Sequence, residues 1–277
     1  MSNDFTLKQF SAEHSVDTAT RLSSYIDALE AFDGIEQLQE LKACEHERIK
    51  FAQGNSLLDV GCGFGLETLR YAGAISAKGK VAGIDASADF IDEARRRATA
   101  AGLDIDFRVG DANALPYPEG SFDCVRAERI LIYLEKPESA AQEMQRVLKA
   151  GGRLALIEPD FSTTTINLSN RALVRRVIAH EVDTAVVQSW LPGPLLGILR
   201  ALKFSDIQLA TRVLIFPQKL CSSYFLGVGE RAAKAGAIST HELEEWSSGI
   251  ALLEKQGLLF GSIGYFLFTA LNPHMRL

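Results

Sequence analysis

Hydrophobic and polar positions follow two different periods along this chain. Up to residue 53, apolar side chains recur every three or four positions, as at Leu22, Ile26 and Leu29, and this spacing predicts helices. Beyond it, short apolar runs bounded by glycine and charged residues alternate with helical stretches. The order of elements predicts an α/β fold in which a doubly wound, mostly parallel sheet carries helices on both faces. The apolar runs predict seven strands, at Leu57–Val60, Lys80–Ile84, Asp106–Val109, Cys124–Ala127, Arg153–Glu158, Phe204–Phe216 and Ser262–Ala270.

The first of these strands contains Asp59 and runs into a turn with alternating glycines, residues 61–65, which opens a helix. The next two strands end in the carboxylates Asp85 and Asp111. The carboxyl ends of parallel strands border the ligand-binding crevice of such a sheet, and glycine allows a ligand to approach the backbone closely. The pattern therefore predicts a nucleoside site. Asp85 is placed to accept from both ribose hydroxyls, and Asp111 from an adenine amino group.

The spacing of the glycines separates this turn from a dinucleotide fingerprint. That fingerprint is Gly-x-Gly-x-x-Gly and holds a pyrophosphate at a helix N-terminus. Here the spacing is Gly61-x-Gly63-x-Gly65, and Glu67 in the first turn of the following helix would oppose a phosphate. The pattern favours a ligand that has a cationic centre and no polyphosphate.

At these residues the chain resembles the class I S-adenosylmethionine-dependent methyltransferases, whose glycine loop is Asp-x-Gly-x-Gly-x-Gly. The resemblance runs from about Ser56 to Pro159 and is closest to the ubiquinone/menaquinone-type and natural-product branch. It implies a Rossmann-like sheet whose seventh strand is antiparallel, and S-adenosylmethionine as the cofactor, with S-adenosylhomocysteine as the product. Its further motifs are Leu115–Pro118, Ser121–Val125 and Arg146–Leu154.

The resemblance and the strand ends together give the candidate cofactor-binding residues. Arg129, just after the fourth strand, has two possible roles. It could pair with the carboxylate of the cofactor, or brace a loop by pairing with Glu128 or Glu158, and we favour the bracing role. The full set is Asp59, Gly61, Cys62, Gly63, Gly65, Asp85, Ala86, Asp111, Ala112, Ala127 and Arg129.

Three helical parts are expected to form a lid over the carboxyl ends of the strands. They are residues 1–53 and two insertions in the tail, at about 161–190 and 217–257, which contain the helical stretches Arg171–Ser189 and Cys221–Lys255. This divides the chain into an N-terminal lid (1–53), a cofactor-binding core (54–160) and a remainder (161–277) that adds strands six and seven and both insertions. A lid excludes water and aligns the acceptor with the sulfonium.

The expected reaction is methyl transfer to an O, N or C atom of a small molecule, by proximity and in-line displacement, in secondary or cofactor metabolism. A sulfonium is an activated donor, so the protein contributes positioning and, for some acceptors, a proton-removing group. His180 and His14 are the candidates for that group. Trp190, Phe161 and Tyr265 are candidates for the acceptor pocket, although each such aromatic is more often part of a core.

Composition narrows the possible partners. The net charge is −6 and the pI about 5.5, which argues against nucleic acid, since binding it depends on Lys and Arg. Four cysteines without ligand spacing indicate a reduced, cytoplasmic interior and no metal site. The uncharged stretch Gly257–Leu271 is shorter than the ~20 residues of a membrane span and suits a strand. We expect a small-molecule acceptor, no membrane span, and a monomer or homodimer.

Two other classes of protein stay open. One is a catalytically silent protein that binds S-adenosylmethionine as a sensor or regulated subunit. The other is an NAD-type oxidoreductase on a similar sheet, which the glycine spacing disfavours.

Overall fold

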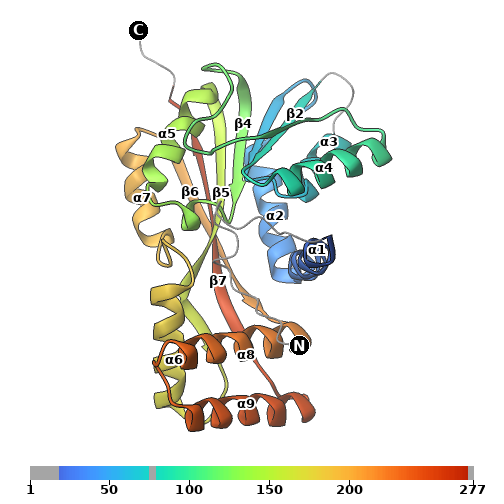
Figure 1. Cartoon of the computed structure of the whole chain (residues 1–277). Helices are drawn as coiled ribbons and strands as arrows, with labels where there is room; N and C mark the ends of the chain where they lie inside the picture. Colours follow the sequence, from blue (N-terminus) through green and yellow to red (C-terminus); the bar gives the residue numbers. More distant parts are fainter. Residues whose placement is uncertain (1–18, 75–78, 274–277) are drawn as a thin grey trace.

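The computed structural model describes residues 19–74 and 79–273 of the chain. Seven strands form one sheet in the order β3-β2-β1-β4-β5-β7-β6, and β7 runs antiparallel to both of its neighbours. The predicted fold class, a mostly parallel α/β sheet with an antiparallel seventh strand, is confirmed (Figure 1). The strands are β1 (Ser56–Val60), β2 (Lys80–Asp85), β3 (Asp106–Val109), β4 (Phe122–Glu128), β5 (Leu148–Ile166), β6 (Ser205–Ile215) and β7 (Gly261–Leu271).

Helices cover both sides of this sheet. In Figure 1, α5 and α7 lie to the left of the central strands, and α2, α3 and α4 lie to the right. Ser87 caps α4 by accepting a hydrogen bond from the backbone N of Phe90, as its position before an acidic first turn predicts. These helices are α1 (Ala19–Asp33), α2 (Glu36–Ile49), α3 (Leu66–Ala74), α4 (Ala88–Ala101), the short 3-10 helix η2 (Leu131–Tyr133), α5 (Pro137–Val147) and α7 (Pro192–Ala201).

The long strands β5, β6 and β7 extend past the rest of the sheet and carry a second group of helices at the lower end of Figure 1. This group consists of α6 (Arg171–Thr184), α8 (Gln218–Lys234) and α9 (Thr240–Lys255). Arg231 pairs with the buried Glu181 at 2.7 Å and joins α8 to α6. The indole nitrogen of Trp246 donates to the carbonyl of Phe225 at 2.7 Å and joins α9 to α8.

The tail departs from the expected elements in three places. The stretch expected as one helix from Cys221 is two, because Gly236 takes a left-handed conformation (φ +76°) and Ser239 starts α9 with a capping box. The helix expected to reach Ser189 ends at Thr184, and α7 was not expected. Strand β5 continues to Ile166 because it pairs with β7 again after a register shift between Asp160 and Thr165.

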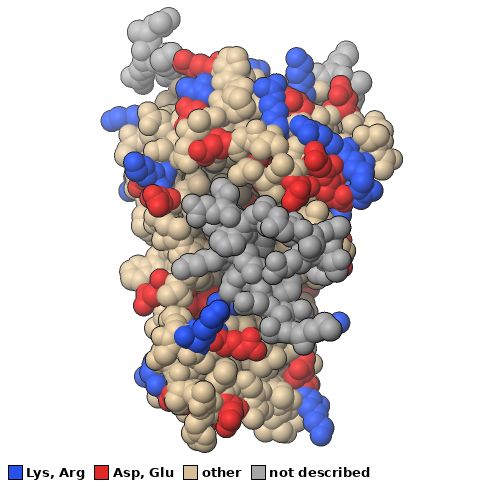
Figure 2. All heavy atoms as spheres, viewed as in Figure 1, with Lys and Arg blue, Asp and Glu red and all other residues tan. Residues whose placement is uncertain are grey.

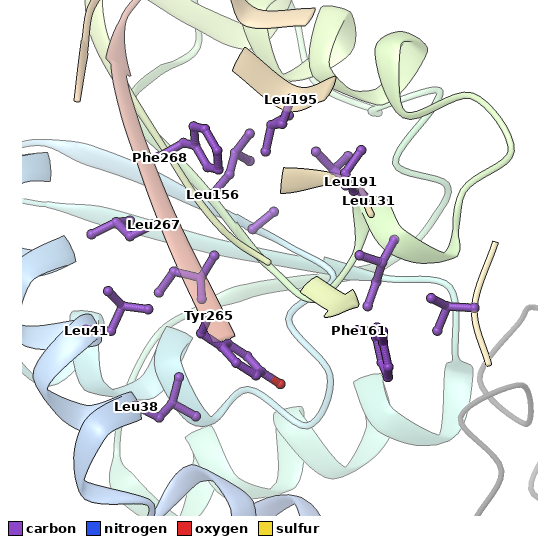
Figure 3. Packing of buried hydrophobic residues seen from close by; sticks show 14 of the residues in the cluster. Leu38, Leu41, Leu131, Leu156, Phe161, Leu191, Leu195, Tyr265, Leu267 and Phe268 are labelled. Atoms are coloured by element: carbon purple, nitrogen blue, oxygen red, sulfur yellow. The ribbon is translucent and has the colours of Figure 1, made fainter. Parts of the chain in front are cut away.

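Side chains of β5 and β7 fill the centre of the molecule. Figure 3 shows Phe268 and Leu156 beside Leu195 of α7, whereas Leu267 lies near Leu41 of α2. All five side chains are buried. Successive residues of a strand point to opposite faces, so β7 packs against helices on both sides and holds the two helical layers in place.

The visible surface mixes charges of both signs. In Figure 2, Lys and Arg atoms are interspersed with Asp and Glu atoms. On α4, Arg96 and Arg97 both pair with Glu93 at 2.7 Å. The basic run of α4 is therefore largely compensated by its own helix. Among the described residues, no helix is long and apolar enough to cross a membrane.

Candidate cofactor and acceptor site

Three glycines shape the turn between β1 and α3. Gly61, Gly63 and Gly65 have φ angles of 70°, 53° and 82°, a region that side chains disfavour. A Cβ at Gly61 would lie 1.9 Å from Cδ1 of Ile130. The backbone N of Gly61 donates to the carbonyl of Ile84 at 2.7 Å. The turn is therefore pinned to the end of β2, in a conformation that requires glycine.

Asp85, at the end of β2, connects this turn to α4. Its Oδ2 accepts from the backbone N of Gly63 and its Oδ1 from the backbone N of Ser87, both at 2.9 Å. Burial raises the pKa of the carboxyl group, while these backbone donors oppose the rise. Each carboxylate oxygen has a further lone pair, so Asp85 can still accept from hydroxyl groups. Ala86 follows it and is exposed.

Asp111 lies one strand farther along the same edge of the sheet. The backbone N of Gly110 donates to the carbonyl of Asp85 at 2.9 Å, which places the ends of β2 and β3 side by side. The Oδ1 of Asp111 accepts from the backbone N of Asn113 at 2.8 Å, and its side chain is exposed. Ala112 is half-buried behind it. The sheet thus brings Asp85 and Asp111 together, as their strand positions predict.

The prediction that Asp59 and Ala127 contact the cofactor does not fit their positions. Both side chains are only 1% exposed. Asp59 Oδ1 lies 2.8 Å from Nη1 of Arg126, and its Oδ2 accepts from the hydroxyl of Thr68 at 2.7 Å. Asp59 and Arg126 are partners in the register of β1 and β4. Asp59 therefore supports the glycine turn from behind, and Ala127 belongs to the core.

A buried network of charges extends from this pair to α2. Arg126 contacts Glu45 at 2.6 Å and Glu128 at 3.1 Å. Lys42 contacts Glu128 at 2.9 Å and Glu67 at 3.1 Å. Burial alone would raise the pKa of Glu128, but Lys42, Arg129 and Arg126 lower it to about 2. Glu67 is thus bound to α2. The sequence does contain a signal for this network, because Lys42 and Glu45 are charged residues at buried positions of α2. The network was not predicted from it.

Arg129 contacts Glu128, one of the two partners named for a bracing role. Its φ is 54°, and its backbone N donates to the carbonyl of Ile157 at 2.8 Å. The Nε of Arg129 lies 3.6 Å from Oε1 of Glu128. Its guanidinium carbon lies 4.9 Å from the centre of the Phe32 ring, within range of a cation–π interaction. Arg129 therefore links β4 to α1.

Helix α1 lies against the glycine turn. The ring of Tyr25 stacks on Phe90 of α4 with 5.6 Å between ring centres. Phe90 also contacts Phe64 in the turn, edge to face at 6.1 Å. Ile26 is buried in the same apolar cluster. The N-terminal helix thus packs directly on the segment that would hold the cofactor.

Two of the three aromatic candidates for an acceptor pocket lie in the interior of the protein. Phe161 and Tyr265 are buried, and the ring of Tyr265 lies 5.7 Å from that of Phe32. Figure 3 shows the Tyr265 hydroxyl directed toward the side where Phe161 lies. Trp190 does not fit a pocket wall, because it is 61% exposed. It lies in the turn after α6, and nothing in its sequence position showed this.

Of the two candidate histidines, the structure describes one, His180, and it is not part of the strand-end cluster. His180 is half-buried on α6, which packs on β5 and α8, and its carbonyl accepts from Thr184. His14 lies outside the described residues. Among the described residues, no group of three or more His, Cys, Asp or Glu side chains could hold a metal ion.

A single antiparallel strand in a seven-stranded sheet, an alternating glycine turn and carboxylates on the next two strands define a class I methyltransferase fold. Residues 58–156 match the family described as Methyltransferase domain. Residues 58–156 thus form a methyltransferase domain, of the class I S-adenosylmethionine-dependent type that the sequence motifs indicate.

Individual relatives resemble the chain over different shares of its length. An uncharacterized 37.1 kDa protein in transposon TN4556 of Streptomyces fradiae is 29% identical over 89% of this chain and 70% of its own length. The ubiquinone/menaquinone biosynthesis C-methyltransferase UbiE of Hahella chejuensis is 36% identical over 43% of this chain and 48% of its own. The match thus spans about half of that enzyme. The structure of the [4+2]-cyclase SpnF is similar with a TM-score of 0.55 and 27% identity, over 86% of this chain and 81% of the other.

Proposed function

We propose that this protein transfers the methyl group of S-adenosylmethionine to an O, N or C atom of a small molecule. The observation that carries the proposal is Asp85, fixed by Gly63 and Ser87 at the end of β2 with lone pairs left for ribose hydroxyls. A phosphoethanolamine N-methyltransferase from Haemonchus contortus shares the fold, with a TM-score of 0.62 and 18% identity, over 95% of this chain and 60% of the other. That enzyme was solved with S-adenosylmethionine.

In the proposed mechanism the protein contributes mainly alignment. The glycine turn, Asp85 and Asp111 would hold the nucleoside of the cofactor, which would supply an activated methyl group. An acceptor atom held in line with that group would take the methyl carbon as the S–C bond breaks, and S-adenosylhomocysteine would remain. Holding the two reactants in line accounts for much of the rate enhancement. Excluding water prevents water from competing with the acceptor at the cationic sulfonium.

The lid assignment is part of the same proposal. Helix α1 packs on Phe64 of the glycine turn, while α6 packs on β5, α8 on α6 and α9 on α8. We propose that α1 and these insertions enclose the acceptor. We also propose that the protein acts in the cytoplasm as a monomer or homodimer without a nucleic-acid partner, supported by the net charge of −6 and four free cysteines.

In one alternative function, the protein binds S-adenosylmethionine but does not transfer its methyl group. SpnF has a similar structure and is named a [4+2]-cyclase. A protein of this fold can therefore be named for a reaction other than methyl transfer. Calorimetry with S-adenosylhomocysteine, S-adenosylmethionine, NAD and ATP tests the cofactor. Incubation of methyl-labelled S-adenosylmethionine with a metabolite extract then tests transfer. Tight binding without any labelled product would favour the alternative, and preferred NAD binding would exclude both.

A further inference from the structure

A second buried carboxyl group lies at this edge of the sheet. Glu158, on β5, is fully buried. Its Oε1 accepts hydrogen bonds from the backbone N of Leu131 at 2.8 Å and of Ile130 at 3.2 Å. Its Oε2 is also buried and has no hydrogen-bond partner in the part of the chain that the structure describes. One oxygen fixes the carboxyl group, and the other is left without a partner in a place where an unpaired polar atom is costly.

The groups around Glu158 come from several elements. Glu128 of β4, the following Arg129, and Tyr133 of η2 interact with it electrostatically. Arg129 in turn interacts with Tyr265 of β7 and Tyr25 of α1. Glu158, one arginine and three phenols therefore gather where α1 meets the end of β4 and the middle of β5 and β7.

Arg129 keeps positive charge available in this cluster. Glu128 lies closer to Lys42 (2.9 Å) and Arg126 (3.1 Å) than to Arg129 (3.6 Å). The charge of Glu128 is thus shared among three cations. A new anion beside Arg129 would be stabilised, and in a water-poor site this effect is larger than in solution.

The two neighbouring carboxyl groups differ in their protonation. Glu128 has a pKa of about 2 and stays ionised. Burial raises the pKa of Glu158 to about 8, although the backbone donors of Leu131 and Ile130 act in the opposite direction. Carboxyl groups whose environments separate their pKa values in this way are suited to different roles, and a proton acceptor works best with a pKa near the working pH.

We propose that Glu158 is the general base of an acceptor site for phenols and enols, in which Arg129 and the hydroxyls of Tyr133 and Tyr265 stabilise the oxyanion that forms. This inference rests on the proposed methyl transfer and names its acceptor class. The acceptor O–H bond breaks and its proton passes to Oε2 of Glu158. The oxygen, or the α-carbon of an enolate, uses its electron pair to bond the methyl carbon. The S–C bond breaks with its pair on sulfur, and Glu158 later releases the proton to water.

The same charges disfavour an amine acceptor. A neutral amine becomes positively charged as it takes the methyl group, and Arg129 would oppose that charge. A phenol or enol instead becomes negative before transfer, and Arg129 favours it. The cluster therefore discriminates by the sign of the charge that develops on the acceptor.

Turnover with matched acceptors tests the role of Glu158. The full chain is incubated with labelled S-adenosylmethionine and 1-naphthol, 4-nitro-1-naphthol or 1-naphthylmethylamine. We expect methylation of the naphthols but not the amine, with a 1-naphthol rate that rises with pH to a plateau above about 8. Glu158→Gln should lower that rate by about 100-fold and remove the inflection. It should change the rate with the nitronaphthol, which ionises unaided near neutral pH, by less than about threefold.

Two controls separate catalysis from structure. Glu143→Gln, which alters a carboxyl bound to Arg146 on α5, should leave both naphthol rates unchanged. Equal losses on both naphthols in Glu158→Gln, or a preference for the amine, would overturn the inference.

A binding measurement does not depend on turnover. Protein saturated with S-adenosylhomocysteine should bind 4-nitro-1-naphthol in its anionic form, seen by absorbance, at a pH where the free compound is neutral. Arg129→Gln should abolish this shift. Failure to bind S-adenosylhomocysteine would defeat the proposed function itself. Normal binding of it with no bound naphtholate would overturn only the acceptor class.

Discussion

Asp59 and Arg126 lie opposite each other on β1 and β4, with 2.8 Å between Oδ1 and Nη1 and almost no exposure of either side chain. The carboxylate that begins the glycine motif is therefore directed into the protein and not toward a ligand. Its contribution to cofactor binding is indirect, because it holds the strand from which the turn departs.

Loss of this pair should destabilise the fold. Asp59→Asn leaves Arg126 buried with one anion fewer, and breaking a buried pair on one side typically costs about 3–5 kcal/mol. Urea unfolding followed by circular dichroism measures the change. As a control, Asp92→Ala removes an exposed pair with Arg95 and should cost less than about 0.5 kcal/mol. Equal effects of the two substitutions would contradict a structural role for Asp59.

Asp85 and Asp111 should differ in their effect on cofactor affinity. Asp85→Ala should weaken binding of S-adenosylhomocysteine by about 1–3 kcal/mol, the size of lost hydrogen bonds to a charged group. Asp111→Asn should cost less, because an amide oxygen can still accept from adenine. Isothermal titration calorimetry on both variants decides this, and unchanged affinity in Asp85→Ala would remove the ribose assignment.

The two tryptophans should behave differently in solution. Trp246 is fully buried and donates to Phe225, so Trp246→Ala should cost about 3–5 kcal/mol. Trp190 is largely exposed, so Trp190→Ala should change stability by less than about 0.5 kcal/mol and leave affinity for S-adenosylhomocysteine within about threefold. Iodide should quench the fluorescence of Trp246→Phe strongly and that of Trp190→Phe weakly. Protection of Trp190 from iodide would restore it as a pocket residue.

Glu158 should make the free energy of unfolding fall as the pH rises from about 5 to about 9. Its folded-state pKa of about 8 lies above the usual value of a glutamate, about 4.3, so the folded state binds the proton more tightly. Its contribution is complete below about pH 4 and is lost as the pH rises through about 8. Glu158→Gln should therefore gain stability relative to the parent between about pH 5 and about pH 9, measured by urea unfolding at both. A parallel pH dependence in the two proteins would show that the carboxyl does not titrate there.

Gly61 should not tolerate a side chain. In Gly61→Ala the new Cβ would meet Ile130, and φ of 70° would be strained. The double variant with Ile130→Ala relieves the collision but not the strain, so it should recover only part of the stability relative to Ile130→Ala alone. Thermal unfolding of the three variants provides the comparison, and full recovery would show that the backbone conformation is not the constraint.

The sequence patterns predicted those helices and strands whose limits are set by neighbouring residues. Asp106–Val109 agrees with β3 at both ends, and Asp85 follows directly from the strand that it ends. The fold resemblance added the antiparallel β7. What escaped prediction depends on residues far apart in the chain. Arg126 meets Glu45 across 81 positions and Asp59 across 67, and no periodicity shows which buried charges will meet.

The exposure of Trp190 and the length of β5 were not predicted for a similar reason. Trp190 is an aromatic residue of the kind that lines pockets, but its exposure depends on where α6 ends. The continuation of β5 to Ile166 depends on its pairing with Ser262 and Gly261 of β7, about a hundred residues away in the sequence. Glu158 was predicted only as a possible partner of Arg129, because its burial and the pairing of one oxygen with the backbone of Ile130 and Leu131 depend on residues far from it in the sequence.

The contact between α1 and the glycine turn has a consequence for the speed of the reaction cycle. Phe64 is part of the turn and also part of the surface on which α1 rests, while Asp33 at the end of α1 is tied to Lys42 at 2.5 Å. A nucleoside entering or leaving past this helix must first separate it from Phe64 and Phe90, with Gly34 as the natural hinge. Replacement of S-adenosylhomocysteine by S-adenosylmethionine would then require α1 to open. The turnover number would depend on the rate of this opening as well as on the rate of methyl transfer.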